Sequence, residues 1–439
     1  MKRLLSIALC ALALSTGVSP ASAEGLALEA AVRLALSKNE RAMKAPLRVA
    51  VADAQLERAR DAFLPSLTAQ GSGTLRPEVR GSNNLSTNAG VTLSQPLLNP
   101  SAFPQYAQQS HNLESEKWGS AQDLRQLAFD TARAFLQALT AEGVQRSAQR
   151  KLDSAELNWQ TAKARADAGL ASSNDVTRAE LTLATSRGQL ANALGNVRRA
   201  YLNLSFLVGQ QVEGPLIPPD NTTHAAQRFE EARANPVRNA LERRSQTLAK
   251  AEERRPDVRA LRERNAGLEA SAREPLYRMI PSLTLSGQVR VVPDQLPSDN
   301  AVDKSASLNA SWQVFDAGLR YADRKQRLAQ LESSRLDEKL LIRSVQNEIA
   351  LALAALRAAR GSYEAAEAAA SAAQSNAVET NVLYQQGLAR AIEVNDANDK
   401  QFEADVTLAA AKLAMEQAYL DLRSALGFGP IDEQRETGH

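Results

Sequence analysis

Acidic residues follow a glycine at the same spacing in two distant parts of the sequence. Asp175 lies six residues after Gly169, and Glu393 lies six residues after Gly387, so the second pair repeats the first at an offset of 218 in the numbering. Asp396 follows three residues later, so Glu393 and Asp396 would share one face of a helix. Carboxylates gathered on one face attract cations. An acid just after a turn also stabilises a helix N-terminus, by about 0.3–1 kcal/mol, and both explanations stay open here.

The sequence offers no cluster of residue types that would carry out catalysis. Its three histidines, His111, His224 and His439, lie far apart, and none has the spacing of a helical metal-binding pair. We find neither a phosphate-binding glycine-rich loop nor a nucleophile elbow. We therefore expect no enzyme activity and no catalytic, cofactor-binding or metal-binding residues.

The first 23 residues have the features of a signal peptide. A basic pair precedes an apolar run over residues 4–14, and an A-x-A cleavage signal ends at Ala23. The apolar run is too short to anchor the chain across a bilayer. We expect export, with a mature chain that starts at Glu24 and has lost Cys10, the only cysteine. Disulfides and thiolate metal sites would then be excluded.

The charge of the expected mature chain is balanced. Without Lys2 and Arg3, the 52 basic and 50 acidic residues become 50 of each. A net charge near zero argues against a general nucleic-acid-binding protein.

The chain is an internal duplication. The stretch Leu64-Pro-Ser-Leu-Thr returns at Ile280, an offset of 216, and Tyr201-Leu-Asn-Leu with its following Gly209 returns at Tyr419, an offset of 218. The glycine–acid pair has the same offset of 218. We therefore expect a signal peptide (1–23), a first repeat (24–209), a linker (210–235), a second repeat (236–427) and a C-terminal tail (428–439).

Each repeat contains two segments in which apolar and polar residues alternate, as in β-strands. They cover residues 65–77, 85–96, 281–293 and 305–314, with turn-rich loops at 78–84 and 294–303. A half-buried soluble sheet would explain any one pair, but four such strands in an exported chain also match outer-membrane barrel strands. Four strands cannot close a barrel, and an open edge in lipid leaves backbone groups unpaired. If the strands face lipid, the chain must oligomerise, and three copies would supply twelve strands.

The remaining segments are predicted to be helical, and two of them are very long. Residues 101–168 and 317–386 would each extend on the order of 100 Å. Shorter helices are predicted at 26–37, 39–63, 237–253 and 256–273, and the charged run 243–264 is predicted to be a solvated helical face. The last helix of each repeat carries a coiled-coil seam, formed by Leu190, Ala193, Val197, Ala200, Leu204 and Leu207, and by Leu408, Ala411, Met415, Ala418, Leu422 and Ala425.

The duplicated plan resembles the TolC-like outer-membrane efflux protein family over essentially the whole mature chain. The resemblance is carried by "FLPSLTAQGS" from Phe63, "VTLSQPLLNP" from Val91, "IPSLTLSGQ" from Ile280 and "ASWQVFDAGLR" from Ala310. A further segment, "RRPDVRALRERN" from Arg254, is similar to the start of the second half in drug-efflux members. The order of these segments, repeated twice, is what makes the resemblance specific.

The resemblance implies a mostly α-helical chain with short β-strands that forms a homotrimer. Twelve strands would make one transmembrane barrel in the outer membrane, the helical hairpins would form a periplasmic tunnel, and the linker would lie at an equatorial patch. The channel would be passive, and a periplasmic adaptor would join it to an inner-membrane pump. We expect contact with outer-membrane lipid and none with nucleic acid.

The resemblance also assigns roles to the residues at the two glycine turns. Gly169 and Gly387 would lie at the periplasmic tips of two helical hairpins, with Glu393 and Asp396 as carboxylate rings at the pore constriction. Asp175 and Tyr384 match residues of the contacts that close the hairpins. One departure concerns the turn itself, where Ala389 and Arg390 are transposed relative to the family pattern. The exposed turn residues are candidates for adaptor contact: Gly169, Leu170, Ala171, Gly387, Leu388 and Ala389.

Two other interpretations compete with the channel. A periplasmic adaptor should show a lipoyl-like β domain and an N-terminal anchor, and neither is visible; a structural coiled-coil rod should lack the paired strands. The substrate is not specified, because drugs, metal ions, proteins and polysaccharides can use this architecture. The segment that begins with Arg254 gives a weak indication of small-molecule efflux.

Overall fold

A computed structural model describes the protein over residues 25–75, 85–219, 249–291 and 302–431. The expected signal peptide, the loop at 78–84, most of the loop at 294–303 and much of the linker lie outside these ranges. Most of the helix expected at 237–253 and the histidines His224 and His439 also lie outside them.

The elements follow the same order in both halves of the chain, which confirms the duplicated fold. The first half contains β1 (Leu26–Ala27), α1 (Leu28–Lys38), α2 (Glu40–Asp61), β2 (Ser66–Leu75), β3 (Leu85–Leu98), α3 (Ala102–Asp167) and α4 (Ser173–Val208), followed by β4 (Leu216–Ile217). The second half contains α7 (Pro256–Tyr277), β5 (Ser282–Val291), β6 (Val302–Ser311), α8 (Leu319–Gln385) and α9 (Ala391–Ala425).

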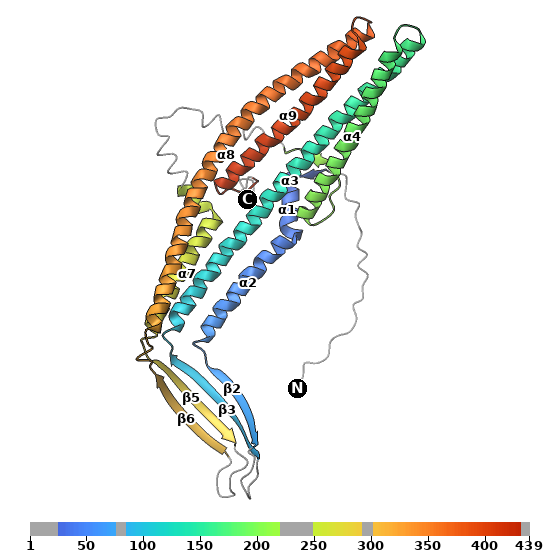
Figure 1. The fold of residues 1–439 in the computed structure, drawn as a ribbon. Helices are drawn as coiled ribbons and strands as arrows, with labels where there is room; N and C mark the ends of the chain where they lie inside the picture. The colour runs from blue at the N-terminus through green and yellow to red at the C-terminus, as the bar shows by residue number, and fades with distance from the viewer. Residues whose placement is uncertain (1–24, 76–84, 220–248, 292–301, 432–439) are drawn as a thin grey trace, which may run out of the picture.

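The molecule is elongated, with the strands at one end and two helical tips at the other (Figure 1). The helices α3 and α8 have 66 and 67 residues and run along most of this length. Towards the tips α3 pairs with α4 and α8 pairs with α9, whereas towards the sheet α2 and α7 take over as their neighbours. The strand end and the acidic tips are therefore joined by two continuous helices.

The four longer strands form one antiparallel sheet in the order β2-β3-β5-β6. The central pair, β3 and β5, comes from different repeats. The ladders place Leu67 opposite Leu93, Leu93 opposite Gly287, and Gly287 opposite Ala306. Because directly opposed residues point to the same side of a sheet, the apolar sets of all four strands lie on one face. This face includes Leu67, Ala69, Val91, Leu93, Leu285, Val289, Ala306 and Leu308, with Lys304 near the loop end, while the other carries Ser, Thr, Asn and Gln together with Arg290 and Asp303.

The last strand is predicted at 305–314 but runs over Val302–Ser311. Its partner β5 begins at Ser282, which lies opposite Ser311, so no ladder partner remains for the next three residues. Apolar and polar residues continue to alternate beyond Ser311, through Trp312, although strand pairing has ended. For this reason periodicity alone places the end of β6 too late. The Trp312 indole N–H instead donates to the Met279 carbonyl at 3.0 Å.

Helix α7 is predicted to end at residue 273 but continues to Tyr277, through Pro275. A proline in a helix has no N–H for the carbonyl four residues earlier, which here belongs to Ser271. An arginine of α8, Arg327, donates to that carbonyl at 2.7 Å. The helix therefore tolerates Pro275 because a neighbouring helix replaces the missing donor.

The charged run 243–264 is not a uniformly solvated face over its described part, which corrects the prediction. Arg255 is buried, and the Arg259 guanidinium lies 4.6 Å from the ring centroid of Trp118 in α3. The reason is that α7 packs against both α3 and α8, so side chains on two of its sides are covered.

The core lies along the helical hairpins, where the predicted seams face inward. In the first half α3 contributes Phe129, Phe135 and Leu136, and α4 contributes Leu204. In the second half Val345, Ile349 and Leu356 of α8 pack against Met415, Ala418 and Leu422 of α9. Helix α9 has a second buried face, because Leu420 belongs to the cluster around α3. That second face attaches the two hairpins to each other.

Candidate functional site

Both hairpin tips are built by the same glycine-terminated helix end. Gly169 and Gly387 have positive φ angles of 72° and 78°, a conformation that costs other residues free energy. The amide N–H of Leu170 donates to the carbonyl of Arg165 at 2.8 Å, and that of Leu388 donates to Leu383 at 2.8 Å. These are the bonds of a Schellman motif, which ends a helix and reverses the chain.

The acids that come six residues after each glycine stabilise the first turn of the next helix. A carboxylate oxygen of Asp175 accepts from the backbone N–H of Ser172 at 3.2 Å, and the Ser172 hydroxyl accepts from the Asp175 N–H. Together these bonds form a capping box at the start of α4. Glu393 accepts from the backbone N–H of Arg390 at 3.0 Å at the start of α9. Local helix capping accounts for the repeated spacing.

We predict that Ser172→Ala weakens the first turn of α4 by about 1 kcal/mol, because Ala cannot accept the capping bond. Hydrogen exchange of the amides around residues 172–176 would measure the change, expected as an increase of several fold. Ser173→Ala is the matched control, since its side chain lies just beyond the cap. Equal exchange in the two variants would show that the capping box contributes little.

Glu393 and Asp396 lie on the exposed surface of α9 within two turns of the tip. Asp396 is near Lys400, whose pKa is raised first by its hydrogen bond to Glu403 and further by the charges of Asp396 and Asp399. The acidic tip of α9 thus includes a second cation besides Arg390, and the sequence alone did not draw attention to Lys400. Both side chains are exposed, and one carboxylate oxygen of Glu393 is used in the cap of α9.

Tyr384 is buried between the two hairpins of one chain. The Arg165 guanidinium lies 4.4 Å from its ring centroid, and the same side chain donates to the Tyr384 carbonyl at 2.8 Å. Arg165 is in the last turn of α3, so this contact joins the hairpins close to their tips. The described contacts of Asp175, by contrast, stay within its own turn. Contacts of either residue with a second copy remain a prediction.

A row of ion pairs continues this junction along α3 and α9. Arg133 pairs with Asp421 at 2.6 Å, Arg150 with Asp405 at 2.7 Å and Lys151 with Asp399 at 2.7 Å. The cations all come from α3 and the acids from α9. Sequence reasoning missed this row because the partners belong to different repeats and share no local pattern.

The turn residues themselves are exposed. Leu170 and Leu388 are 80% and 74% exposed, and Ala171 and Ala389 are partly exposed. Two apolar side chains at the ends of the hairpins could therefore contact another protein without rearrangement of the fold.

None of the helices in the described ranges combines the length and the apolar character needed to cross a lipid bilayer. Within the same ranges, no three His, Cys, Asp or Glu side chains gather in a way that could hold a metal ion. His111 instead has its ring Nδ1 2.9 Å from a carboxylate oxygen of Glu263.

Comparisons with known proteins agree with this architecture. The family model of outer membrane efflux proteins matches residues 31–210 and 247–428. Protein CyaE of Bordetella pertussis is 27% identical over 358 residues, which cover 78% of this chain and 71% of CyaE.

Solved outer-membrane channels share the fold. The CmeC channel of Campylobacter jejuni has a TM-score of 0.75 at 16% identity, covering 93% of this chain and 88% of CmeC. The MtrE channel of Neisseria gonorrhoeae, solved in its open state, has a TM-score of 0.75 at 20% identity, covering 92% of this chain and 89% of MtrE.

The family match extends over both halves of the chain, and the family and the matched structures are channel proteins rather than enzymes. They place the protein in the outer membrane as a TolC-like efflux or secretion channel. The chain belongs to the outer membrane efflux protein family.

Proposed function

We propose that three copies of this chain form the passive exit duct of a tripartite efflux or type I secretion system. An inner-membrane pump and a periplasmic adaptor would hand over the substrate, and the duct would conduct it outward. The observation that carries this proposal is the sheet, whose four strands have one apolar face and continue into two hairpins of about 100 Å.

The sheet supports a membrane-spanning barrel shared between copies. In the described part of the chain, β2 and β6 each pair on one side only, so each presents an edge. An edge in lipid leaves backbone groups without partners at several kcal/mol each, and pairing β6 of one copy with β2 of the next removes it. Three copies give twelve strands, an even number within the usual range of outer-membrane barrels. The apolar face would then contact lipid, and the hydroxyl- and amide-bearing face would line the lumen.

The opposite end would form the periplasmic entrance. Three copies of α9 would place Glu393 and Asp396 as two carboxylate rings around the pore. Such rings favour cations over anions. While the tips are close together, the crowded carboxylates would repel anionic cargo, and this repulsion would weaken when the tips separate. Leu170, Ala171, Leu388 and Ala389 would contact the adaptor at the exposed ends.

We predict that Asp396→Asn increases the size of the single-channel conductance steps of the purified protein in planar bilayers and lowers its preference for cations. The preference should fall by roughly half, because three of six ring carboxylates lose their charge. Asp167→Asn is the matched control: Asp167 is also an exposed acid one turn from a tip, but it belongs to α3. Unchanged steps and selectivity in Asp396→Asn would remove the constriction from the proposal, and no steps from the folded parent would contradict the channel.

The substrate class stays open in this proposal. The segment from Arg254, which gives a weak indication of small-molecule efflux, makes its contacts inside the chain: Arg254 lies 4.5 Å from the ring centroid of Phe428, and Arg255 pairs with Asp257 and Glu348. A segment used for internal packing gives no direct information on cargo. A periplasmic adaptor or a rod, the alternative function, would leave the apolar sheet face and its two edges without a role.

A further inference from the structure

The two repeats join their helices end to end at equivalent places, but with different chemistry. In the first repeat α4 ends at Gly209, next to the start of α2. The Asn39 side chain links the two ends. Its oxygen accepts from the Arg41 N–H at 2.8 Å, and its amide nitrogen donates to the carbonyls of Phe206 at 3.2 Å and Leu207 at 2.9 Å. A single neutral side chain therefore caps the start of α2 and the end of α4.

Helices α2 and α7 begin at Glu40 and Pro256, an offset of 216, so the counterpart of Asn39 is Arg255, which does not do the same. An arginine side chain has no acceptor for the first N–H groups of α7, and the donors of Arg255 are bound to carboxylates instead of to the C-terminal carbonyls of α9. The Arg255 guanidinium donates to the Asp257 carboxylate through two bonds of 3.0 and 2.6 Å. Arg255 also pairs with Glu348 of α8 at 2.6 Å.

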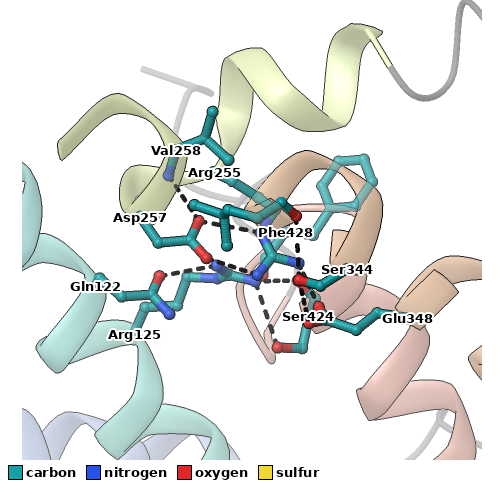
Figure 2. Close-up of polar contacts among 10 residues, drawn as sticks. Gln122, Arg125, Arg255, Asp257, Val258, Ser344, Glu348, Ser424 and Phe428 are labelled. Atoms are coloured by element: carbon teal, nitrogen blue, oxygen red, sulfur yellow. Dashed lines mark hydrogen bonds and ion pairs between the residues drawn. The ribbon is translucent and has the colours of Figure 1, made fainter. Parts of the chain in front are cut away.

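The donor that the second junction lacks comes from the first repeat. Arg125 of α3 donates to the Ser424 carbonyl, which is the counterpart of the capped Phe206 carbonyl, and to the Phe428 carbonyl at 3.2 Å. Figure 2 shows Arg125 reaching from α3 into the space between Asp257, Glu348 and the end of α9. Burial is the main cause that lowers the pKa of Arg125, and the nearby Arg255 adds to it.

Further arginines hold the backbone that follows α9. The Arg254 guanidinium stacks on the Phe428 ring, and Arg423 donates to the carbonyls of Gly429 at 2.7 Å and Ile431 at 3.1 Å. The segment after α9 is thereby fixed to α3 and to the start of α7. This second junction consists of charged groups from four parts of the chain, whereas the first is formed by the Asn39 amide and a bond from Lys38 to the Gln210 side chain.

We propose that Arg125 is a positioning residue that sets the direction of α9, and with it the place of the acidic tip, from the first repeat. Helix α9 has 35 residues and ends at this junction, so it acts as a lever of about 50 Å. A tilt of about 5° at the junction would move the tip by about 4–5 Å over that length. The consequence for conduction rests on the proposed function, but the consequence for the position of the tip does not.

The expected mature chain has no cysteine, so the tips can be labelled at chosen positions. Ala168→Cys and Gln386→Cys place one spin label on each exposed tip, and mixing with unlabelled protein isolates the distance within one chain. Pulsed electron paramagnetic resonance then measures that distance with and without Arg125→Met. We expect Arg125→Met to shift or broaden the distribution by about 4–5 Å, the movement expected from the lever.

Arg133→Met is the matched control, because it removes another arginine that connects α3 to α9. Its pair with Asp421 is open to solvent, with side-chain exposures of 31% and 52%, and such pairs contribute little. An unchanged distribution in Arg125→Met, or equal changes in both variants, would overturn the proposal. If Arg125→Met does not fold, Arg125→Lys keeps the charge but loses the second donor group, and an unchanged distribution there would also overturn it.

Bilayer recording of the same variants separates this inference from the proposed function. A moved tip with unchanged conductance supports the positioning role and contradicts the constriction. A tip that does not move contradicts the positioning role whatever the conductance.

Discussion

An arginine in place of Ala306 is expected to prevent the protein from assembling in the membrane. Ala306 lies at the middle of β6, on the apolar face shared by all four strands. A charged residue at the midplane of a barrel's lipid face costs about 2–4 kcal/mol, so three copies would lose about 6–12 kcal/mol. Recovery of heat-modifiable trimer from outer membranes measures the effect, and we expect little or none.

The neighbouring Ser305→Arg is the matched control for that experiment. Ser305 lies opposite Gln288 on the polar face, one residue away on the same strand. In the proposed barrel an arginine there would point into the lumen, where substitutions change selectivity more than stability. Trimer recovery close to that of the parent is expected. If both variants assemble equally well, the apolar face does not contact lipid and the proposed barrel is wrong.

The strands are predictable from sequence because alternation reports directly which residues share a face. Their pairing is not, because β3 and β5 belong to different repeats and only the register shows that Val91 lies opposite Val289. The end of β6 depends in the same way on where its partner begins. Local periodicity therefore identifies the strands, but the residue at which a strand ends depends on its partner strand, which lies elsewhere in the sequence.

The same limit applies to the helices and the tips. The turn glycines and the acids that cap the following helices are visible in the sequence, since turn geometry and capping act within a few residues. In the sequence, Pro275 suggests a helix end because a proline lacks the N–H of a helical hydrogen bond. The donor that replaces this N–H, Arg327, belongs to another helix and is not visible in the local sequence. Arg165 and Arg125 escape notice for a related reason: each contacts the other repeat, and an isolated arginine on a long helix has no distinctive pattern.

The offset between the repeats, which is 216 or 218 residues, supplies information that local patterns cannot. The starts of α2 and α7 align Asn39 with Arg255, whose donors are bound to carboxylates, so the donor that the first junction has is missing from the second and is supplied from elsewhere in the fold. Comparing repeats residue by residue can thus identify long-range contacts, provided that the structure shows what the first copy does. The comparison works because both copies must satisfy the same backbone groups at the helix ends.

The junction glycines give the second large expected effect. Gly209 has a φ angle of 76°, and a Cβ there would lie 3.0 Å from the Lys38 carbonyl carbon and 3.2 Å from the Asn39 nitrogen. Gly209→Ala therefore combines the left-handed conformation, at about 1–2 kcal/mol, with crowding of backbone atoms, at about 1–3 kcal/mol. We expect a total of about 2–5 kcal/mol per chain, measured as a lower temperature for dissociation of the detergent-solubilised protein.

Gly169→Ala separates these two causes. Gly169 has a nearly identical φ of 72°, but a Cβ added at this exposed tip would meet no atom within 4 Å in the described part of the chain. Gly169→Ala should lower stability only by the conformational cost of about 1–2 kcal/mol, and this loss of stability should be confined to the tip. Equal melting temperatures for the two variants would mean that the backbone at the ends of α4 and α2 moves apart at little cost in free energy. The end-to-end junction could not then hold α4 in a fixed direction, and by equivalence α9 would need some support other than its own junction.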